Sequence, residues 1–247
     1  MIGYWWVVLA AAQEGEFAYS GGFDGSAPNY VAGKPVVVAH SQGNLSVRCV
    51  DTDTLSARIR YSLTGSSEAG MKAFGDGIGM SVSGDAAGGS VKSRVPSSKS
   101  GVTTSDVQVT VNIPAGTKAL TITHSGKGWV EVLNCSGALK VTAGTGGAYA
   151  SGKMTALTLT ASGGDVKVEP DKGTPFTGAV NVAAPGGSLS FVLPSAQGGK
   201  LNAKAAEVTV SQTVMGTNTA TLVSGDLGLA GPNIALSARD KLSVTAP

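Results

Sequence analysis

The sequence predicts an all-β protein, a single-domain β-solenoid in which short strands stack along one winding path. Three observations predict it. Glycine contributes 36 of the 247 residues and only 14% are charged, which favours strands and turns over helices. Apolar and polar residues alternate in short runs, the period of a strand with one buried face. A unit of the form Gly-x-apolar-x-apolar also recurs, and so short a unit buries its apolar side only by stacking on its neighbours.

The repeat is regular enough to give a spacing. Its copies begin at Gly43, Gly128, Gly137, Gly164, Gly178, Gly187, Gly199 and Gly225. First core positions at Leu120, Val130 and Leu139 predict strands about nine to ten residues apart, which is one strand plus one turn. The alternative fold is an antiparallel β-sandwich. We favour the solenoid because irregular glycine turns outnumber the Asn-Gly and Asp-Gly turns of tight hairpins.

These motifs resemble those of a known family. The run Asn112-Ile113-Pro114-Ala115-Gly116, followed by short strands joined by Ser-Gly turns, is similar to the bacterial "putative adhesin" family of β-strand-repeat proteins. The resemblance covers roughly residues 35–210, and the spacing slips after Lys172. It implies a β-helical fold and a place in the cell envelope. It implies little biochemistry, because a fold does not fix a function.

The N-terminal residues 1–12 form an apolar run that ends in three alanines. Its length suits the hydrophobic region of a secretory signal peptide with a cleavage site after Ala12, and is below the ~20 residues of a membrane span. No basic residue precedes Lys34, so the usual basic start is missing. The alternative is a first buried strand or cap over residues 2–9. We expect a signal peptide, and hence an exported, periplasmic or surface protein.

Residues 13–34 are rich in glycine and contain the rings of Phe17, Tyr19, Phe23 and Tyr30. We expect this segment to be an N-terminal cap or linker that folds its rings over the first coil.

Residues 35–247 form the predicted strand-repeat domain. Its first strands are expected over residues 36–39, 45–50 and 57–63, and a further strand over residues 78–82. Residues 83–105 are rich in glycine and serine and are predicted to be a mobile loop. The last part of the chain is expected to cap the far end of the solenoid, where an uncovered edge would invite end-to-end association.

Residues able to perform catalysis are few. His40 and His124 each precede a serine, but no orienting acid or Gly-x-Ser-x-Gly turn accompanies them. The histidines and cysteines lack the close pair spacing of a zinc site, and the carboxylates Asp51 and Asp53 are too few for calcium. We therefore predict no catalytic residue, no cofactor and no metal site.

One acidic group tests the enzyme hypothesis further. Asp165, Glu169 and Asp171 are the densest carboxylates, and β-helical polysaccharide-degrading enzymes use such groups when they converge on one face. Lys167 and Lys172 lie beside them, so an ordinary ion-paired surface is the better interpretation. The net charge of +2 and the absence of phosphate-binding or aromatic-basic motifs argue against nucleic acid.

The two cysteines, Cys49 and Cys135, are both expected to face inward. In an exported protein a disulfide between them would contribute ~3–5 kcal/mol, provided that their Cα atoms come within ~7 Å. The alternative is two separate buried thiols, favoured by their distance in the sequence.

The function that follows is a non-enzymatic envelope or secreted protein, an adhesin-like binding module or scaffold with a glycan or protein as its surface ligand. The alternatives are a structural protein that self-assembles through its ends as a homo-oligomer, and a carbohydrate-active enzyme. No membrane span is expected.

Overall fold

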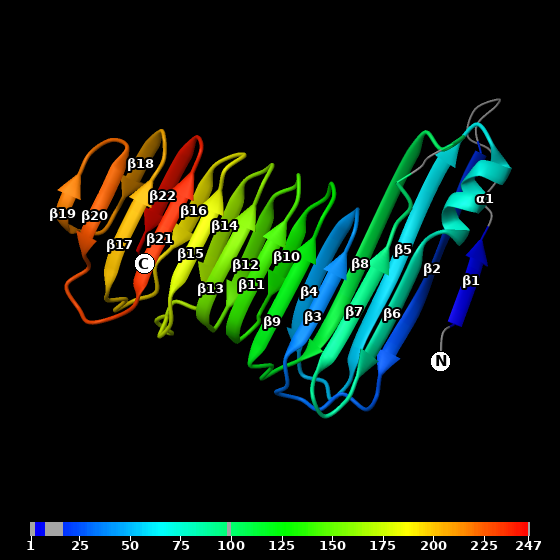
Figure 1. Cartoon of the computed structure of the whole chain (residues 1–247), viewed down its shortest axis with the longest axis horizontal. Helices are drawn as coiled ribbons and strands as arrows, with labels where there is room; N and C mark the ends of the chain where they lie inside the picture. The colour runs from blue at the N-terminus through cyan, green and yellow to red at the C-terminus, as the bar shows by residue number, and fades with distance from the viewer. Residues whose placement is uncertain (1–2, 8–16, 98–99, 247) are drawn as a thin grey trace.

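The computed structural model describes residues 3–7, 17–97 and 100–246, with backbone only for residues 3–7. The described strands form two large mixed sheets of 11 strands each, stacked face to face in an elongated molecule whose strands run across its long axis (Figure 1). In spatial order, the first sheet contains β1 (Gly3–Val7), β2 (Phe17–Ala27), β5 (Leu55–Gly65), β8 (Thr104–Pro114), β4 (Asn44–Val50), β10 (Val130–Leu133), β12 (Ala148–Gly152), β14 (Val166–Pro170), β16 (Leu189–Val192), β22 (Lys241–Thr245) and β18 (Glu207–Val210). The second sheet contains β19 (Met215–Asn218), β20 (Leu222–Asp226), β17 (Lys200–Lys204), β21 (Asn233–Ala238), β15 (Val180–Ala184), β13 (Met154–Ala161), β11 (Gly137–Ala143), β9 (Ala119–His124), β3 (Val36–His40), β7 (Gly89–Arg94) and β6 (Gly79–Gly84).

The prediction of an all-β fold is confirmed, whereas the arrangement of the strands differs from the predicted solenoid. Two facing sheets, with no closed solenoid among the described residues, are closer to the sandwich alternative than to the predicted β-solenoid. Unlike an antiparallel sandwich, however, the middle of both sheets is built from parallel pairs such as β9–β11 and β10–β12. The predicted step of nine to ten residues is the distance between successive strands, and successive strands enter opposite sheets. Leu120 therefore lies beside Leu139 in one sheet, while Val130 lies beside Ala148 in the other.

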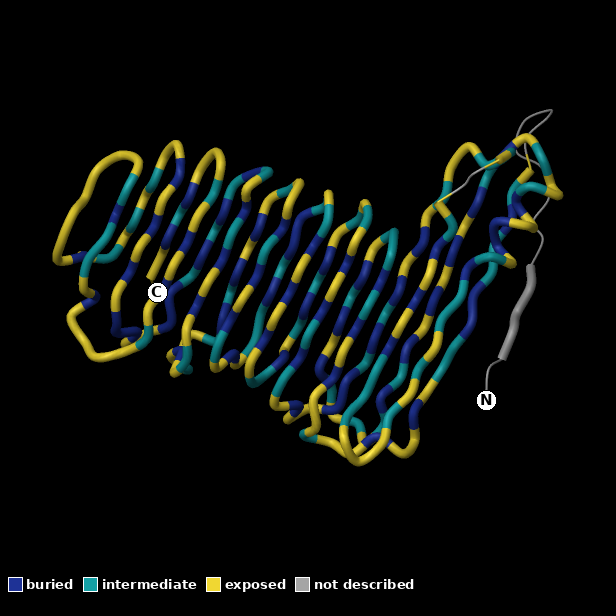
Figure 2. Tube along the Cα trace, viewed as in Figure 1, coloured by how far each residue is buried: buried dark blue, intermediate teal, exposed yellow. Residues whose placement is uncertain are grey.

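The core lies between the two sheets. Alternate residues of each strand point inward, as the burial pattern of β8 shows, with Val107, Val109, Val111 and Ile113 buried and the residues between them facing outward (Figure 2). The inward residues of both sheets form one continuous apolar cluster. Because the pleat places every second side chain on the same face, the period of two in the sequence is sufficient to specify which residues enter this core.

The N-terminal part of the first sheet is antiparallel and is built from strands of 11 residues. The strands β2, β5 and β8 pair side by side, and the predicted cap segment 13–34 thus contributes a full strand. The rings of Tyr19, Phe23 and Tyr30 are buried. The three strands predicted over residues 36–63 are present as β3, β4 and β5.

Two features of the following segment differ from the expectation. A helix, α1 (Glu68–Asp76), begins after Ser67, whose hydroxyl accepts a hydrogen bond from the Gly70 amide as an N-cap. The predicted loop 83–105 contains β7, which pairs with both β6 and β3 and buries Val91. In the part of the chain that the structure describes, no helix is long and apolar enough to span a membrane.

Two strand pairs lie out of sequence order, one in each half of the molecule. The pair β3 and β4 lies between β7–β8 and β9–β10. The pair β21 and β22 likewise lies between β15–β16 and β17–β18. At the N-terminal end β1 pairs with β2, while residues 8–16, including the predicted cleavage site, lie outside the described residues. The signal peptide stays a prediction.

Candidate functional site

The outer face of the first sheet carries side chains in rows that cross the strands. One row consists of Thr110, Ser46, Glu131, Tyr149 and Lys167, on β8, β4, β10, β12 and β14. Each faces outward because the residues on either side of it in its strand are buried. Neighbouring strands of a sheet are ~4.8 Å apart. The row is therefore a flat, closely spaced array of polar groups around one aromatic ring.

Trp129 is the most exposed large ring next to this row. It precedes β10 and is 42% exposed, and its backbone amide donates a 3.0 Å hydrogen bond to Oδ1 of Asn44. Its neighbour on the β12 side is Gly147, where a Cβ atom would collide with the indole. The glycine thus leaves room for the indole to lie against the backbone of the sheet, with its other side open to solvent.

Tyr149 is fixed by a charged pair on β14. Its hydroxyl donates a 2.6 Å hydrogen bond to Oε2 of Glu169, and Nζ of Lys167 lies 2.8 Å from Oε1 of the same carboxylate. Nζ of Lys167 also lies 5.8 Å from the centre of the tyrosine ring, within reach of a cation–π interaction. The hydrogen bonds from Lys167 and Tyr149 lower the pKa of Glu169, and the hydrogen bond to Glu169 raises the pKa of Tyr149. At neutral pH the carboxylate is ionised and holds the ring in place.

Glu131 and Arg48 complete this group of side chains. The hydroxyl of Ser46 donates a 3.0 Å hydrogen bond to Oε2 of Glu131, and Nε of Arg48 donates one of 3.2 Å to Oγ of Ser46. We call the surface formed by Trp129, Tyr149, Glu131, Lys167, Glu169 and Arg48 the aromatic face. It combines two supported rings with donors and acceptors of both charges.

Two shallow hollows lie on the same side of the sheet, over β2, β5 and β8. One of about 370 Å³ is lined by Ser20, Gly21, Gly22, Arg60, Tyr61, Ser62, Asp106 and Gln108. Another of about 440 Å³ is lined by Asp24, Gly25, Ser26, Ser56, Ala57, Arg58, Thr110 and Asn112. Asp24 forms ion pairs with Arg58 at 2.6 Å and with Arg60 at 3.7 Å. These arginines are therefore already paired with an acid of the chain itself.

The carboxylates predicted to be the densest acidic group hold local structure. Oδ1 of Asp165 accepts a 2.8 Å hydrogen bond from the Ser188 amide. Oδ1 of Asp171 accepts hydrogen bonds from the Gly173 amide and the Thr174 hydroxyl, so it stabilises a turn. Glu169 is paired with Lys167 as described above. Among the described residues no group of three or more His, Cys, Asp or Glu side chains could hold a metal ion, Asp51 and Asp53 included.

The two histidines lie together in the interior. His40 ends β3 and His124 ends β9 in register, with ring centres 5.3 Å apart. Nδ1 of His40 is 2.8 Å from Oγ of Ser93, and Nε2 of His124 lies 2.8 Å from the Gly43 carbonyl. Since a carbonyl only accepts, this His124 nitrogen carries the proton. His40 Nε2 and His124 Nδ1 have no hydrogen-bond partner among the described residues. Burial lowers the pKa of His40 to about 4 and also lowers that of His124.

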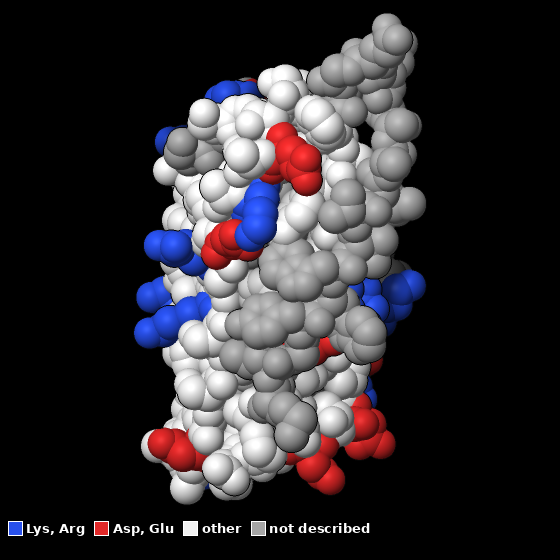
Figure 3. Space-filling model, turned by 90° about the vertical axis from the view of Figure 1, so that its right-hand side faces the viewer, with Lys and Arg blue, Asp and Glu red and all other residues white. Residues whose placement is uncertain are grey.

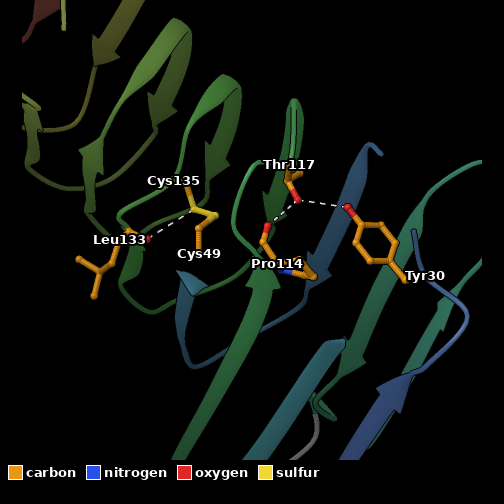
Figure 4. The surroundings of a disulfide bond; sticks show 6 residues. All are labelled: Tyr30, Cys49, Pro114, Thr117, Leu133 and Cys135. Carbon is orange, nitrogen blue, oxygen red and sulfur yellow. Dashed lines mark hydrogen bonds between the residues drawn. A yellow bond between two sulfur atoms is a disulfide. The ribbon is translucent and has the colours of Figure 1, made fainter. Parts of the chain in front are cut away.

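Cys49 and Cys135 form a disulfide in the structure rather than two separate thiols (Figure 4). Their Cα atoms are 4.9 Å apart, because Cys49 lies on β4 and Cys135 follows β10, its neighbour in the first sheet. Tyr30 lies in the same region, where its hydroxyl donates a 2.6 Å hydrogen bond to the Lys34 carbonyl. The bond closes a loop of the chain that contains every element from β5 to β10.

Charged groups elsewhere form no field of one sign on the surface in view. Seen from the end at which α1 lies, acidic and basic side chains both occur, in small groups surrounded by uncharged surface (Figure 3). One ion pair of this end is Lys72 with Asp76, 2.8 Å apart. Such a surface gives no broad electrostatic attraction for a polyanion.

Comparison with known proteins gives distant similarities. No family model and no curated protein matches the sequence. A structure named "putative cell adhesion protein" from Clostridium sporogenes is 13% identical with a TM-score of 0.48, covering 91% of this chain and 99% of its own. A "putative adhesin" from Bacteroides fragilis is 10% identical with a TM-score of 0.38, covering 91% and 96%. A "putative lipid binding protein" from Parabacteroides distasonis is 10% identical with a TM-score of 0.26, covering 92% and 96%. None of the three establishes a family for this chain.

Proposed function

We propose that this protein is an exported, non-enzymatic binding module of adhesin-like type, and that the aromatic face contacts its surface ligand. The observation that carries the proposal is the position of Trp129, whose indole lies on Gly147 and is 42% exposed. Large aromatic residues dominate binding energies when they are held rigidly, because little side-chain entropy is then lost. The neighbouring hydrogen bonds of Tyr149 keep the second ring equally fixed.

Export is supported by the disulfide. Disulfides persist in oxidising compartments and are rare in the cytosol, and the bond between Cys49 and Cys135 joins two buried positions. Fractionation of the native host followed by N-terminal sequencing tests this part. We expect a mature start at Gln13 in the envelope or medium, and an intact Met1 in the cytoplasm with free thiols would contradict it.

A binding role rather than an enzymatic one is supported by the carboxylates of this face. Asp165 accepts a backbone hydrogen bond, and Glu169 is held by Lys167 and Tyr149. Both carboxylates are thus held by other groups of the chain, as expected of structural or ion-paired residues, whereas glycoside hydrolysis uses two carboxylates that face the scissile bond.

The test is the adhesion of labelled protein to cell-surface material. We expect Trp129→Ala to weaken binding at least tenfold, because the exposed ring is removed while the buried core is untouched. Val37→Ala is the matched control, since Val37 is a 44% exposed apolar residue of β3 in the second sheet. Equal binding of both variants and the wild type would exclude the aromatic face as the binding surface.

A second candidate function is self-assembly through the ends. Its supporting observation is β19, an edge strand of the second sheet whose four residues are all exposed. Such an edge presents unpaired backbone groups to a second chain.

A further inference from the structure

We propose that the ligand of the aromatic face is a neutral glycan, bound with its pyranose rings stacked on Trp129 and Tyr149. This inference rests on the proposed function and names the class of ligand for the same site.

The two rings form a platform of the right kind for sugars. Trp129 lies diagonally from Tyr149, one strand across and one same-face position along, which places their Cα atoms about 8 Å apart. One side of the indole is against the sheet and the other is open. A pyranose presents a C–H face of similar size, and a flat ring held on a sheet can contact that face without moving.

The rim of the platform supplies partners for hydroxyl groups. Carboxylate oxygens accept from a sugar hydroxyl and a lysine donates to it, and bonds to ionised groups are stronger than neutral ones. Glu131, Lys167 and Glu169 lie in or beside the row of Tyr149. Each is already oriented by a hydrogen bond or ion pair within the chain, so little order must be created on binding.

The charges of the platform select against anionic ligands. Within the aromatic face the carboxylates of Glu131 and Glu169 are balanced by Lys167 and Arg48, so the face has no surplus of positive charge. Binding of phosphate, sulfate or uronate groups requires a surplus of cations to offset their charge. A nucleic acid, a sulfated glycan and an anionic lipid surface are all disfavoured for this reason.

A protein partner fits the platform less well. The centre of a protein interface is apolar and depleted in charged residues, whereas Trp129 and Tyr149 are bordered by Glu131, Lys167 and Glu169. The other large exposed apolar residues of the described chain are Phe17, Val31, Val37, Met215 and Leu229. None of them lies on β4, β10, β12 or β14. Isolated rings among charges suit a ligand that is itself apolar on one side and polar at its rim.

The experiment is calorimetric titration of the full chain with neutral hexasaccharides of glucose, mannose, xylose and N-acetylglucosamine, with heparin and polygalacturonate as anionic probes. We expect at least one neutral hexasaccharide to bind with an affinity that changes less than twofold between 50 and 300 mM salt, and both anionic probes to bind more weakly.

Trp129→Ala and Tyr149→Ala should each lower that affinity at least tenfold. Tyr149→Phe, which keeps the ring, should lower it less than Tyr149→Ala. Quenching or a shift of tryptophan fluorescence should accompany binding and vanish in Trp129→Ala. Val37→Ala is again the control, and thermal unfolding of each variant verifies the fold.

A second arm separates the failure of this inference from that of the proposed function. Cell-surface material that binds the wild type but not Trp129→Ala is treated either with periodate, which oxidises glycans, or with protease. Loss of binding after periodate supports the inference. Loss after protease alone, or tighter binding of the anionic probes, overturns the glycan while leaving the binding module intact. If untreated surface material binds neither the wild type nor Trp129→Ala, the proposed function is wrong and the inference with it.

Discussion

At the scale of single residues, the pair His40 and His124 makes the fold sensitive to acid. Both rings are buried and each has one nitrogen without a partner among the described residues. A protonated imidazolium here would be desolvated and would repel its neighbour. Burial and the nearby His124 accordingly lower the pKa of His40 to about 4, from an ordinary value of 6.5.

We predict that the free energy of unfolding falls as the pH drops from about 6.5 to about 4. In this window the unfolded chain binds a proton that the folded chain excludes, so acid favours unfolding. The pKa shift of His40 corresponds to about 3 kcal/mol, and His124 contributes in the same direction. Urea unfolding at pH 7 and pH 4.5 measures the loss. The variant His124→Gln removes one of the two groups that become charged in acid, and with it their mutual repulsion. It should therefore lose less unfolding free energy between pH 7 and pH 4.5. An unchanged loss would mean that carboxylates alone cause it.

The sequence predicts much of the burial but not the site. Alternation identifies Val107, Val109 and Val111 as core residues because the pleat allows no other arrangement. The same alternation places Trp129, Glu131 and Tyr149 outside, beside Val130 and Ala148, and this signal was available. What it could not show is that β10 and β12 are neighbours, which brings the two rings together.

At the scale of strands, β7 shows where composition misleads. The glycine- and serine-rich composition of residues 83–105 predicts a loop, yet residues 89–94 pair with two strands. The strand has only one fully buried apolar side chain, Val91. One such residue does not give a recognisable alternation of apolar and polar residues in the sequence. The backbone pairing to β3 and β6 compensates for this, since ladder hydrogen bonds do not depend on the side chains.

A matched pair of substitutions tests β7. Val91→Asp places a carboxylate in the core and should destabilise the fold by about 3–5 kcal/mol. Lys92→Asp, one residue further and exposed, should change stability by less than about 0.5 kcal/mol. Chemical denaturation of both variants gives the comparison. Similar values for the two would show that the segment is a loop in solution.

The disulfide stabilises the pairing of β4 with β10. It closes a loop between residues 86 apart in sequence, and the entropy of such a loop predicts a loss of about 4–5 kcal/mol when it is opened. We expect the double variant Cys49→Ala/Cys135→Ala to show this loss in urea unfolding. Wild-type protein under reducing conditions should unfold at the same urea concentration as the variant. A reduced wild type as stable as the oxidised form would contradict the assignment.

At the scale of the whole molecule, the sheets are stacked but not closed, so they have edges. Among the described strands β19 ends the second sheet at one end of the molecule, and all four of its residues are exposed. We expect association that increases with concentration, measured by light scattering. Thr217→Pro removes a backbone donor of β19 and should suppress it. Thr123→Lys, an exposed change in the middle of the same sheet, should not; a monomer at all accessible concentrations would remove self-assembly as a candidate function.

The order of strands within the sheets could not be derived from local pattern. The repeat spacing predicts successive strands, and it correctly gives Leu120, Val130 and Leu139 as the first core positions of β9, β10 and β11. It does not predict that Val36 lies beside Leu120, because the strands β4 to β8 come between them in the sequence. Long-range pairing of this kind is decided by the assembled core and not by neighbouring residues.

The position of β21 and β22 also affects the time at which the fold can be completed. These strands pair with β15 and β16 on one side and with β17 and β18 on the other. When a chain is synthesised from its N-terminus, residues 200–226 therefore exist before the strands that attach them to the body of the molecule. Until residues 233–245 arrive, β15 and β16 have no partner on this side, and β17, β19 and β20 can pair only among themselves. A protein that must cross a membrane before it folds would gain from this delay, since its sheets stay open until the last strands have followed.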